Sequence, residues 1–116
     1  MKHTVLPRLL LLSLFFLASC GDSPQSVARK FTENLAKGRT TEAKKYATEA
    51  TGEMIDFASK IGAMPVKPEF RFIYVDRKVE GDRATVVYRE SKDGPDEQIE
   101  LVKIDGKWKV HMQPTK

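Results

Sequence analysis

The chain has 116 residues, of which 41% are hydrophobic and 31% charged, and its 20 basic and 16 acidic residues give a net charge of +4. Lys2 and Arg8 lie in an N-terminal segment that we predict to be removed, and without them 18 basic residues remain against 16 acidic ones, a net charge of +2. This weak positive charge argues against a nucleic-acid partner, and the remaining length suits one domain with its own core.

The first 19 residues have the three parts of an export signal. Two cations, Lys2 and Arg8, precede an apolar stretch of ten residues from Leu9 to Ala18, which ends in small residues. At about 1.5 Å rise per residue, such a stretch spans about half of a ~30 Å hydrocarbon core. We therefore predict that residues 1–19 are a cleaved signal peptide and not a membrane anchor.

The apolar stretch closes on Leu17-Ala18-Ser19-Cys20, which resembles the lipobox of bacterial lipoproteins. The resemblance implies that a peptidase cuts between Ser19 and Cys20, that the Cys20 thiol carries a diacylglyceryl group, and that the new amino group is acylated. Several acyl chains give stable anchoring where one is marginal. The alternative is a free or disulfide-bonded thiol, but Cys20 is the only cysteine, so no intrachain disulfide is possible.

A short tether follows the predicted lipid anchor. Residues 20–23 form the lipidated cysteine and this tether, which reaches only about 10–14 Å at about 3.5 Å per residue. A single domain is predicted over residues 24–113, and residues 114–116 form a C-terminal tail. Gly21 stands where an aspartate would retain an enteric lipoprotein at the inner membrane, so we expect a protein of the outer membrane that faces the periplasm.

The domain is predicted to begin with a helix. Ser23 is its N-cap, Pro24 lies in the first turn, where a missing N–H costs nothing, and Gly38 ends it. Its apolar stripe is Val27, Ala28, Phe31 and Leu35. This spacing is typical of an amphipathic helix that covers a core.

Two shorter helices are predicted next. One begins at a cap formed by Thr40 or Thr41, and the other runs from after Gly52 to Gly62. Their predicted core faces are Ala43, Tyr46, Ala47 and Ala50 in the first, and Met54, Phe57, Ala58 and Ile61 in the second.

From Phe70 onward the apolar period changes from helical to alternating. The four predicted strands are Phe70–Val79, Arg83–Glu90, Gln98–Ile104 and Lys107–Met112. Gly81-Asp82 and Asp105-Gly106 are typical of two-residue hairpin turns. The predicted fold class is therefore α+β, with three N-terminal helices packed on a four-stranded antiparallel meander.

The turn at Asp105-Gly106 sets the register of the last hairpin, because it pairs Ile104 with Lys107. The predicted core face is then Ile99, Leu101, Trp108, Val110 and Met112. Lys103 joins that face near the turn, where its stem can lie over Trp108.

The turn at Gly81-Asp82 sets the first hairpin in the same way and predicts a core face of Ile73, Val75, Val79, Ala84, Val86 and Tyr88. Three aromatic residues then fall on the opposite face: Phe70, Phe72 and Tyr74. A large exposed apolar patch marks an interface, so these three are candidates for contact with a second copy or an envelope protein. Alternatively, a bulge reverses the parity of this strand, or residues 65–68 cover the rings, and we favour these structural explanations.

Several segments carry a family resemblance: Ser-Pro-Gln-Ser-Val-Ala-Arg-Lys-Phe, Glu-Ala-Lys-Lys-Tyr-Ala-Thr-Glu and Asp-Gly-Lys-Trp-Lys-Val. Over residues 24–112 the chain resembles small bacterial lipoproteins of domain of unknown function 4878, which are similar in fold to nuclear transport factor 2. The resemblance implies a curved sheet wrapped around helices, a cone that holds a small ligand in some members of the wider superfamily. It implies no reaction, because that superfamily contains enzymes, transport factors and interaction domains.

Most parts of a catalytic site are missing from the predicted mature chain. Lipidation takes Cys20 out of chemistry, and His3 leaves with the signal peptide, so His111 is the remaining histidine. It is predicted opposite Glu100 on the last hairpin, where a cross-strand charge pair is the ordinary explanation. One histidine without a cysteine argues against a zinc site, and no cofactor is predicted.

One enzymatic alternative is proton transfer inside the cone, as in an isomerase or a dehydratase. The polar groups proposed for such a cavity are Tyr46, Asp56 and Tyr88. Asp56 lies outside the apolar stripe of its helix, which favours a side chain in water. The two tyrosines suit core positions with one wet end.

The helical half also carries the most basic stretch, which consists of Arg29, Lys30, Lys37, Arg39, Lys44 and Lys45. Attraction to anionic lipid is one interpretation, and a solvated face with interleaved glutamates is the one we favour. Taken together, the sequence predicts a lipid-anchored cell-envelope protein that serves as a non-catalytic binding or interaction module. A carrier of a small apolar ligand is the alternative, ahead of an isomerase or dehydratase. The predicted partners are the membrane and a second copy or an envelope protein.

Overall fold

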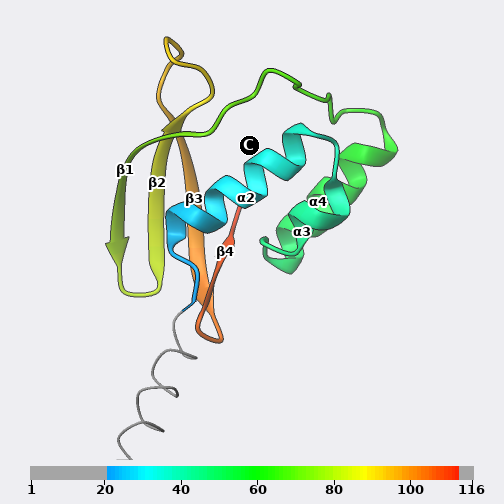
Figure 1. Ribbon diagram of the computed structural model, residues 1–116. Coiled ribbons are helices and arrows are strands. Elements are labelled where there is room, and N and C mark those ends of the chain that lie inside the picture. Colours follow the sequence, from blue (N-terminus) through cyan, green and yellow to red (C-terminus); the bar gives the residue numbers. More distant parts are fainter. Residues whose placement is uncertain (1–20, 113–116) are drawn as a thin grey trace, which may run out of the picture.

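The computed structural model describes residues 21–112. The predicted signal peptide, Ser19 and Cys20 lie outside these residues, as does the C-terminal tail. Three helices precede four strands (Figure 1). Their bounds are Pro24–Ala36 for α2, Thr40–Lys44 for α3, Glu49–Lys60 for α4, Ile73–Glu80 for β1, Arg83–Arg89 for β2, Glu97–Ile104 for β3 and Lys107–Val110 for β4. Within the described part of the chain, no helix has the length and apolar character needed to cross a membrane.

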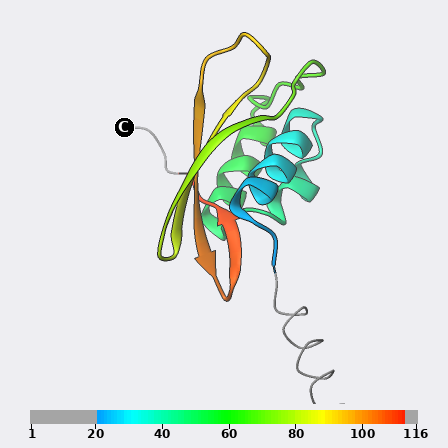
Figure 2. The ribbon, with the colours of Figure 1, turned by 60° about the vertical axis from the view of Figure 1, so that its left-hand side comes forward.

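The sheet is an antiparallel meander in the order β1-β2-β3-β4, which confirms the predicted α+β class. The three helices lie together on one of its faces (Figure 2). Helix α2 crosses that face and contacts every strand, α3 packs against α2, and α4 packs against α3. The core between α2 and the sheet includes Val27, Phe31, Val86, Leu101, Trp108 and Val110.

Helix α2 forms where it is predicted. The Ser23 hydroxyl accepts a hydrogen bond from a backbone N–H of the first turn at 3.2 Å, and Pro24 is the first helical residue. Val27 and Phe31, one turn apart, are both buried against the sheet. Gly38 has a φ of +79°, a left-handed conformation that glycine adopts without strain, and the helix ends just before it.

The boundary between the second and third helices differs from the prediction. Helix α3 has only five residues, and Thr40 is its first residue and not its cap. Thr48 caps α4 instead, because its hydroxyl accepts a hydrogen bond from the backbone N–H of Thr51 at 3.3 Å. Gly52 therefore lies inside α4, where a Cβ atom would sit 3.6 Å from the Lys44 side chain. The glycine marks where α3 and α4 meet, not where a helix begins.

The buried face of α4 is also different from the predicted one. Ile55 is only 4% exposed and Thr51 is fully buried, whereas Phe57 and Ile61, predicted for the core together with Met54 and Ala58, are 64% and 62% exposed. Helix α4 packs chiefly against α3, and its buried residues are Thr51, Gly52 and Ile55, with none after Ile55. The apolar side chains near the C-terminal end of α4 therefore lie beyond its contact with α3.

A β-bulge in β1 reverses the predicted parity of the first hairpin. The register near the turn is as predicted, but it shifts between Tyr74 and Asp76, which leaves Val75 without a partner on β2. Residues on the N-terminal side of a bulge change faces. The prediction that Ile73 and Val75 lie on the core face is therefore wrong. Phe72 lies on the core face instead.

The three aromatic residues proposed as an interface do not share one exposed face. Phe70 and Phe72 are half-buried and pack against the core. The Phe72 ring stacks on Tyr88, with the ring centroids 5.0 Å apart and the planes at 17°. Only Tyr74, at 45%, is exposed. Of the explanations considered from the sequence, the bulge is confirmed.

The last hairpin has the predicted register. Its turn, Asp105-Gly106, has φ values of 53° and 80°, as a tight hairpin turn requires. The Lys103 ammonium lies 5.4 Å from the centre of the Trp108 ring, a cation–π contact that also holds the lysine stem over the ring. Met112 was predicted for the core face, but β4 ends at Val110 and Met112 is exposed.

Candidate functional site

A hollow opens between α2 and the sheet and consists of two adjoining cavities. The linker cavity, of about 250 Å³, is bounded by α2, β2 and the segment that joins α4 to β1. The strand-end cavity, of about 390 Å³, is bounded by α2 and the ends of β3 and β4. Both are lined by Thr32, Leu35 and Tyr88. The combined space is of the size that proteins use to bind small molecules.

Helix α2 forms one wall of the hollow. Thr32 and Leu35 are three residues apart, so they project from the same face of the helix. The Thr32 hydroxyl donates to the Ala28 carbonyl at 2.9 Å within the helix, which satisfies its hydrogen-bonding group locally. This wall is therefore mainly apolar.

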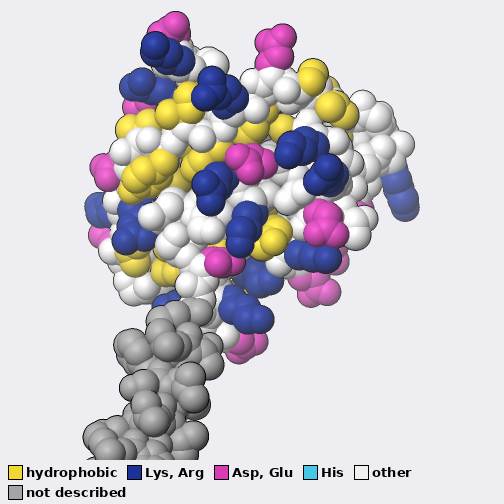
Figure 3. Space-filling view, viewed as in Figure 1, with side chains coloured by type: hydrophobic (Ala, Val, Ile, Leu, Met, Phe, Trp, Pro, Cys, Tyr) yellow, Lys and Arg dark blue, Asp and Glu magenta, His cyan; other side chains and the backbone are white. Residues whose placement is uncertain are grey.

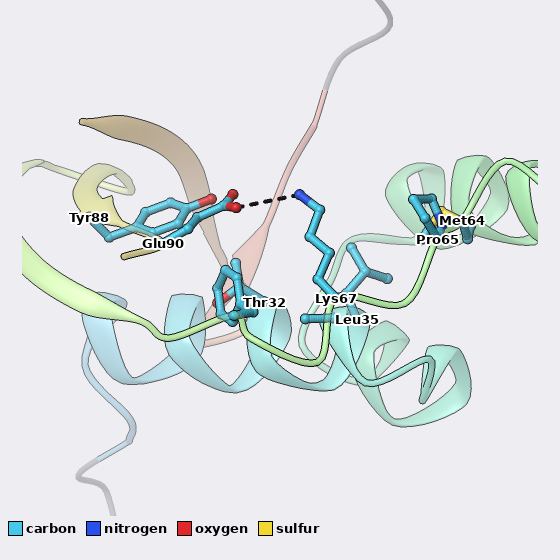
Figure 4. A pocket seen from close by; sticks show the side chains of 9 residues that line it. Thr32, Leu35, Met64, Pro65, Lys67, Tyr88 and Glu90 are labelled. Carbon is cyan, nitrogen blue, oxygen red and sulfur yellow. Dashed lines mark hydrogen bonds and ion pairs between the residues drawn. The ribbon is translucent and has the colours of Figure 1, made fainter. Parts of the chain in front are cut away.

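The linker between α4 and β1 forms a second wall. Met64, Pro65 and Phe70 line the linker cavity, together with the stem of Lys67 (Figure 4). The Lys67 backbone N–H donates to the Ala36 carbonyl at 2.8 Å, which ties the linker to the end of α2. Hydrophobic side chains show at the surface between α2 and the start of β1 (Figure 3). The linker thus closes over one side of an apolar space.

Tyr88 on β2 stands between the two cavities. It is only 8% exposed, and its ring lies under Phe72. Burial, together with the smaller effect of the negative charges of Glu90 and Glu97, raises the pKa of Tyr88 to about 12. The phenol therefore stays protonated at neutral pH and offers the hollow a neutral group that can donate or accept a hydrogen bond.

We expect Tyr88 to make protein stability fall at alkaline pH. Its pKa is about 12 in the folded protein against an ordinary value of 10.0, so the folded state retains a proton that the unfolded state has lost between these values. The free energy of unfolding should fall as pH rises through this window, and this contribution should be constant below it. Denaturant unfolding across this range should show a weaker pH dependence in Tyr88→Phe, and an unchanged slope would contradict the assignment.

A charged pair lies at the mouth of the linker cavity. The Lys67 ammonium is 3.4 Å from a Glu90 carboxylate oxygen (Figure 4). The negative charge of Glu90 is also close enough to Tyr88 to contribute to its raised pKa. Both charged side chains are partly exposed, so they can exchange partners with a ligand at little cost. The linker cavity therefore combines an apolar interior with a polar rim.

The three polar groups predicted for a cavity are not brought together. Only Tyr88 lines the hollow. Tyr46 lies elsewhere, with the Lys30 ammonium 5.8 Å from its ring centre. Asp56 is exposed, as its position outside the apolar stripe predicts, and accepts a hydrogen bond from Lys44 at 2.8 Å. Tyr46, which follows α3, and Asp56, on α4, line neither cavity of the hollow.

The cavity residues that sequence reasoning missed are Thr32, Met64, Lys67 and Glu90. Lys67 and Glu90 are 23 positions apart in the sequence. They meet only because the linker passes the C-terminal end of β2, where Glu90 lies. The prolines that flank Lys67 indicated a non-helical connection, but nothing in the local pattern shows which surface the connection follows.

His111 lines the strand-end cavity, but its ring does not pair with the Glu100 carboxylate as predicted. The backbone pairing does occur, since the His111 N–H donates to the Glu100 carbonyl at 2.9 Å. The ring Nδ1 lies 3.0 Å from the Thr48 hydroxyl oxygen, because β4 has ended and the chain turns toward α4. Among residues 21–112, no group of three or more metal-ligating side chains is present.

Three comparisons place the chain among known proteins. The profile of a domain of unknown function, DUF4878, matches residues 18–111. No curated protein matches. A crystal structure from Campylobacter jejuni, named as a candidate NTF2-like transpeptidase, aligns with a TM-score of 0.56 and 19% identity over 79% of this chain and 100% of that chain. Such a likeness shows an NTF2-like fold. With the profile covering most of its length, this chain belongs to the DUF4878 family.

Proposed function

We propose that this protein is a lipid-anchored cell-envelope protein that binds a small, largely apolar ligand between α2 and the sheet without transforming it. The observation that carries the proposal is the hollow itself, which is lined by Leu35, Met64, Phe70 and Tyr88 and has one charged pair at its rim. Ligand sites of this kind are apolar with a few polar groups that orient the ligand. The cone inferred from the family resemblance would hold its ligand in the same place.

The ligand class follows from the chemistry of the linker cavity. An apolar body would contact Leu35, Met64 and Phe70, and a polar end would reach the Tyr88 hydroxyl and the Lys67–Glu90 pair. Because Tyr88 is neutral at neutral pH and the ion pair has no net charge, the rim suits a hydroxyl, amide or carboxyl group. We propose an amphipathic molecule with a short apolar segment.

The proposal of binding without catalysis rests on the state of the polar groups. Glu90 is ion-paired and partly exposed at the rim, so it has neither the burial nor the isolation that makes a carboxylate a strong base. Thr48 and His111 have the spacing of a nucleophile and a base, but the Thr48 oxygen is buried and caps α4. Within residues 21–112, these two arrangements do not support a catalytic role, so we do not extend the transpeptidase name of the Campylobacter jejuni protein to this chain.

The anchor would hold this hollow close to a membrane. Asp22 forms an ion pair with Lys30 at 3.2 Å, and Ser23 already caps α2, so the domain begins within two residues of Cys20. We expect radiolabelled palmitate to enter the wild-type protein in a bacterial host and not to enter Cys20→Ala. Ser13→Ala, a change within the signal, is the control and should be labelled normally. Labelling of Cys20→Ala would contradict lipidation at this residue.

Native mass spectrometry of the full-length protein from its own host tests the binding proposal. The protein should be extracted from membranes in a mild detergent and released in the spectrometer. We expect a mass that exceeds the lipidated chain by that of one small molecule, which is lost on activation. A chain without added mass, or one bound only to a second copy or a partner protein, would contradict the carrier proposal and favour an interaction module.

A further inference from the structure

A separate groove lies where the described chain begins. It is lined by Gly21 and Asp22 and by residues of β4 that include Trp108. Three lysines line it: Lys45 after α3, and Lys107 and Lys109 on β4. This groove shares no residue with the hollow between α2 and the sheet. It is therefore a second candidate site with its own chemistry.

The charge of the groove is positive. Asp22 is the single acidic residue that lines it, and the Lys30 ammonium neutralises this carboxylate at 3.2 Å. The Lys109 ammonium donates to the Lys45 carbonyl at 2.8 Å, so one cation is held in place over the groove by an uncharged acceptor. Lys107 is exposed beside the turn. The Lys45 ammonium is paired with Glu42 at 3.1 Å, so Lys107 and Lys109 are the ammonium groups that the groove offers to an anion. Lysine binds phosphate as a point charge.

The position of the groove relates it to the predicted anchor. Gly21, which directly follows Cys20, lies so close to the last hairpin turn that a Cβ atom on it would be 3.8 Å from the Gly106 carbonyl oxygen. On the visible face, several Lys and Arg side chains, with acidic side chains among them, lie near the start of the described chain (Figure 3). Because one extended residue spans about 3.5 Å, a lipid on Cys20 would place this groove at the headgroup layer.

We infer that this groove binds the phosphate of an anionic lipid headgroup and so orients the domain on its membrane. The inference rests on the lipid anchoring in the proposed function and adds a second, polar contact to it. Lys107 and Lys109, which carry the inference, do not belong to the basic stretch of the helical half. Several lysines of that stretch are paired with acids: Lys30 with Asp22, Lys44 with Asp56 and Lys45 with Glu42. The cations that matter come from β4, which the fold brings to the start of the chain.

Trp108 is the reporter that this test uses, because it lines the groove and is the only tryptophan in the chain. The full-length protein, purified from membranes, is reconstituted into vesicles of phosphatidylcholine alone or mixed with phosphatidylglycerol. Both preparations contain the same fraction of a lipid with a nitroxide on its headgroup. We expect stronger quenching of Trp108 in the anionic vesicles. About 1 M salt, which shortens the Debye length to about 3 Å, should remove the difference.

Charge-matched variants make the test specific. Lys107→Gln/Lys109→Gln should lose the quenching difference, and Lys107→Gln alone should lose part of it. Lys60→Gln/Lys92→Gln removes the same charge from the end of α4 and from the β2–β3 connection, at the opposite end of the sheet, and should behave as the wild type (Figure 1). Thermal unfolding of each variant checks that the fold is retained, and the exposed Lys107 gives a readout even if Lys109 proves structural.

Equal quenching in neutral and anionic vesicles, or a double variant that quenches like the wild type, would overturn the inference. An emission change with inorganic phosphate in detergent, without any response to anionic vesicles, would overturn it in favour of free phosphate. Flotation of the same vesicles separates the two proposals. If the protein floats with the vesicles but its quenching does not depend on the lysines, only the proposal for the groove is contradicted. If it floats with neither kind of vesicle, the proposal of a lipid anchor is contradicted.

Discussion

Replacing Leu35 with tryptophan should weaken the binding of an apolar dye to this protein about 10- to 100-fold. Leu35 lines both cavities of the hollow, so a larger side chain there occupies the space that an apolar ligand would fill. Losing the burial of one apolar group costs about 1.5–3 kcal/mol, and each 1.4 kcal/mol is about tenfold in affinity. The effect should be on affinity and not on the number of sites.

Anilinonaphthalene sulfonate is a suitable dye, because its rings match the apolar walls and its sulfonate can reach Lys67. The titration would use a form of the protein that lacks residues 1–20, since the core cluster described here is formed by residues between Val27 and Val110. Phe57→Trp is the matched control, because that side chain is 64% exposed on the outer side of α4. Equal dye affinity for the two variants would show that the hollow is not the binding site.

Replacing Ile55 with alanine should destabilise the domain by about 2–5 kcal/mol, the usual range for truncating a buried isoleucine. Ile55 is 4% exposed and belongs to the core cluster, so its removal leaves a cavity beneath α4. Phe57→Ala, two positions along the same helix, should change stability by less than about 0.5 kcal/mol because its ring is exposed. The larger residue should matter less than the smaller one.

Urea unfolding of both variants, followed by far-ultraviolet circular dichroism, measures this difference. If both transitions are two-state and the free energy of unfolding has the same dependence on urea concentration, the midpoints can be compared directly. If Phe57→Ala were the more destabilising change, α4 would bury the face predicted from its apolar spacing and not the one described. The two variants therefore decide between two orientations of one helix.

Local chemistry explains the parts of the fold that could be predicted. The cap at Ser23 and the proline after it define the start of α2 within a single turn. The turn at Asp105-Gly106 sets the last hairpin, since a two-residue turn leaves only one register for the adjacent pairs. In both cases the deciding groups are within a few residues of one another.

Competition between equivalent local signals explains the errors in the helices. Gly52 was interpreted as a helix boundary, whereas the hydroxyl of Thr48 forms the capping hydrogen bond of α4. In the folded protein Ile55 belongs to the core cluster, whereas Phe57 is exposed. The stripe was correctly recognised as helical and wrongly assigned to the core.

The candidate site was predictable only in part. Tyr88 stood out from the sequence and does line the hollow, because alternation along β2 places it on the buried face. Phe72 reaches it only through the bulge in β1, and Lys67 reaches Glu90 only through the path of the linker. Neither a bulge nor a linker path has a local pattern that specifies it.

The sequence by itself determined the α+β class, the first cap and the register of both hairpin turns, because these depend on short-range hydrogen bonds and on alternation within a strand. It also carries the prediction of a lipid on Cys20. Tertiary structure alone decided the parity of β1, the buried face of α4, the hollow beneath the linker and the lysines gathered beside Gly21. Those features depend on which segments far apart in the sequence pack together. Local preferences allow several such arrangements, and the arrangement that buries the core best is the one that forms.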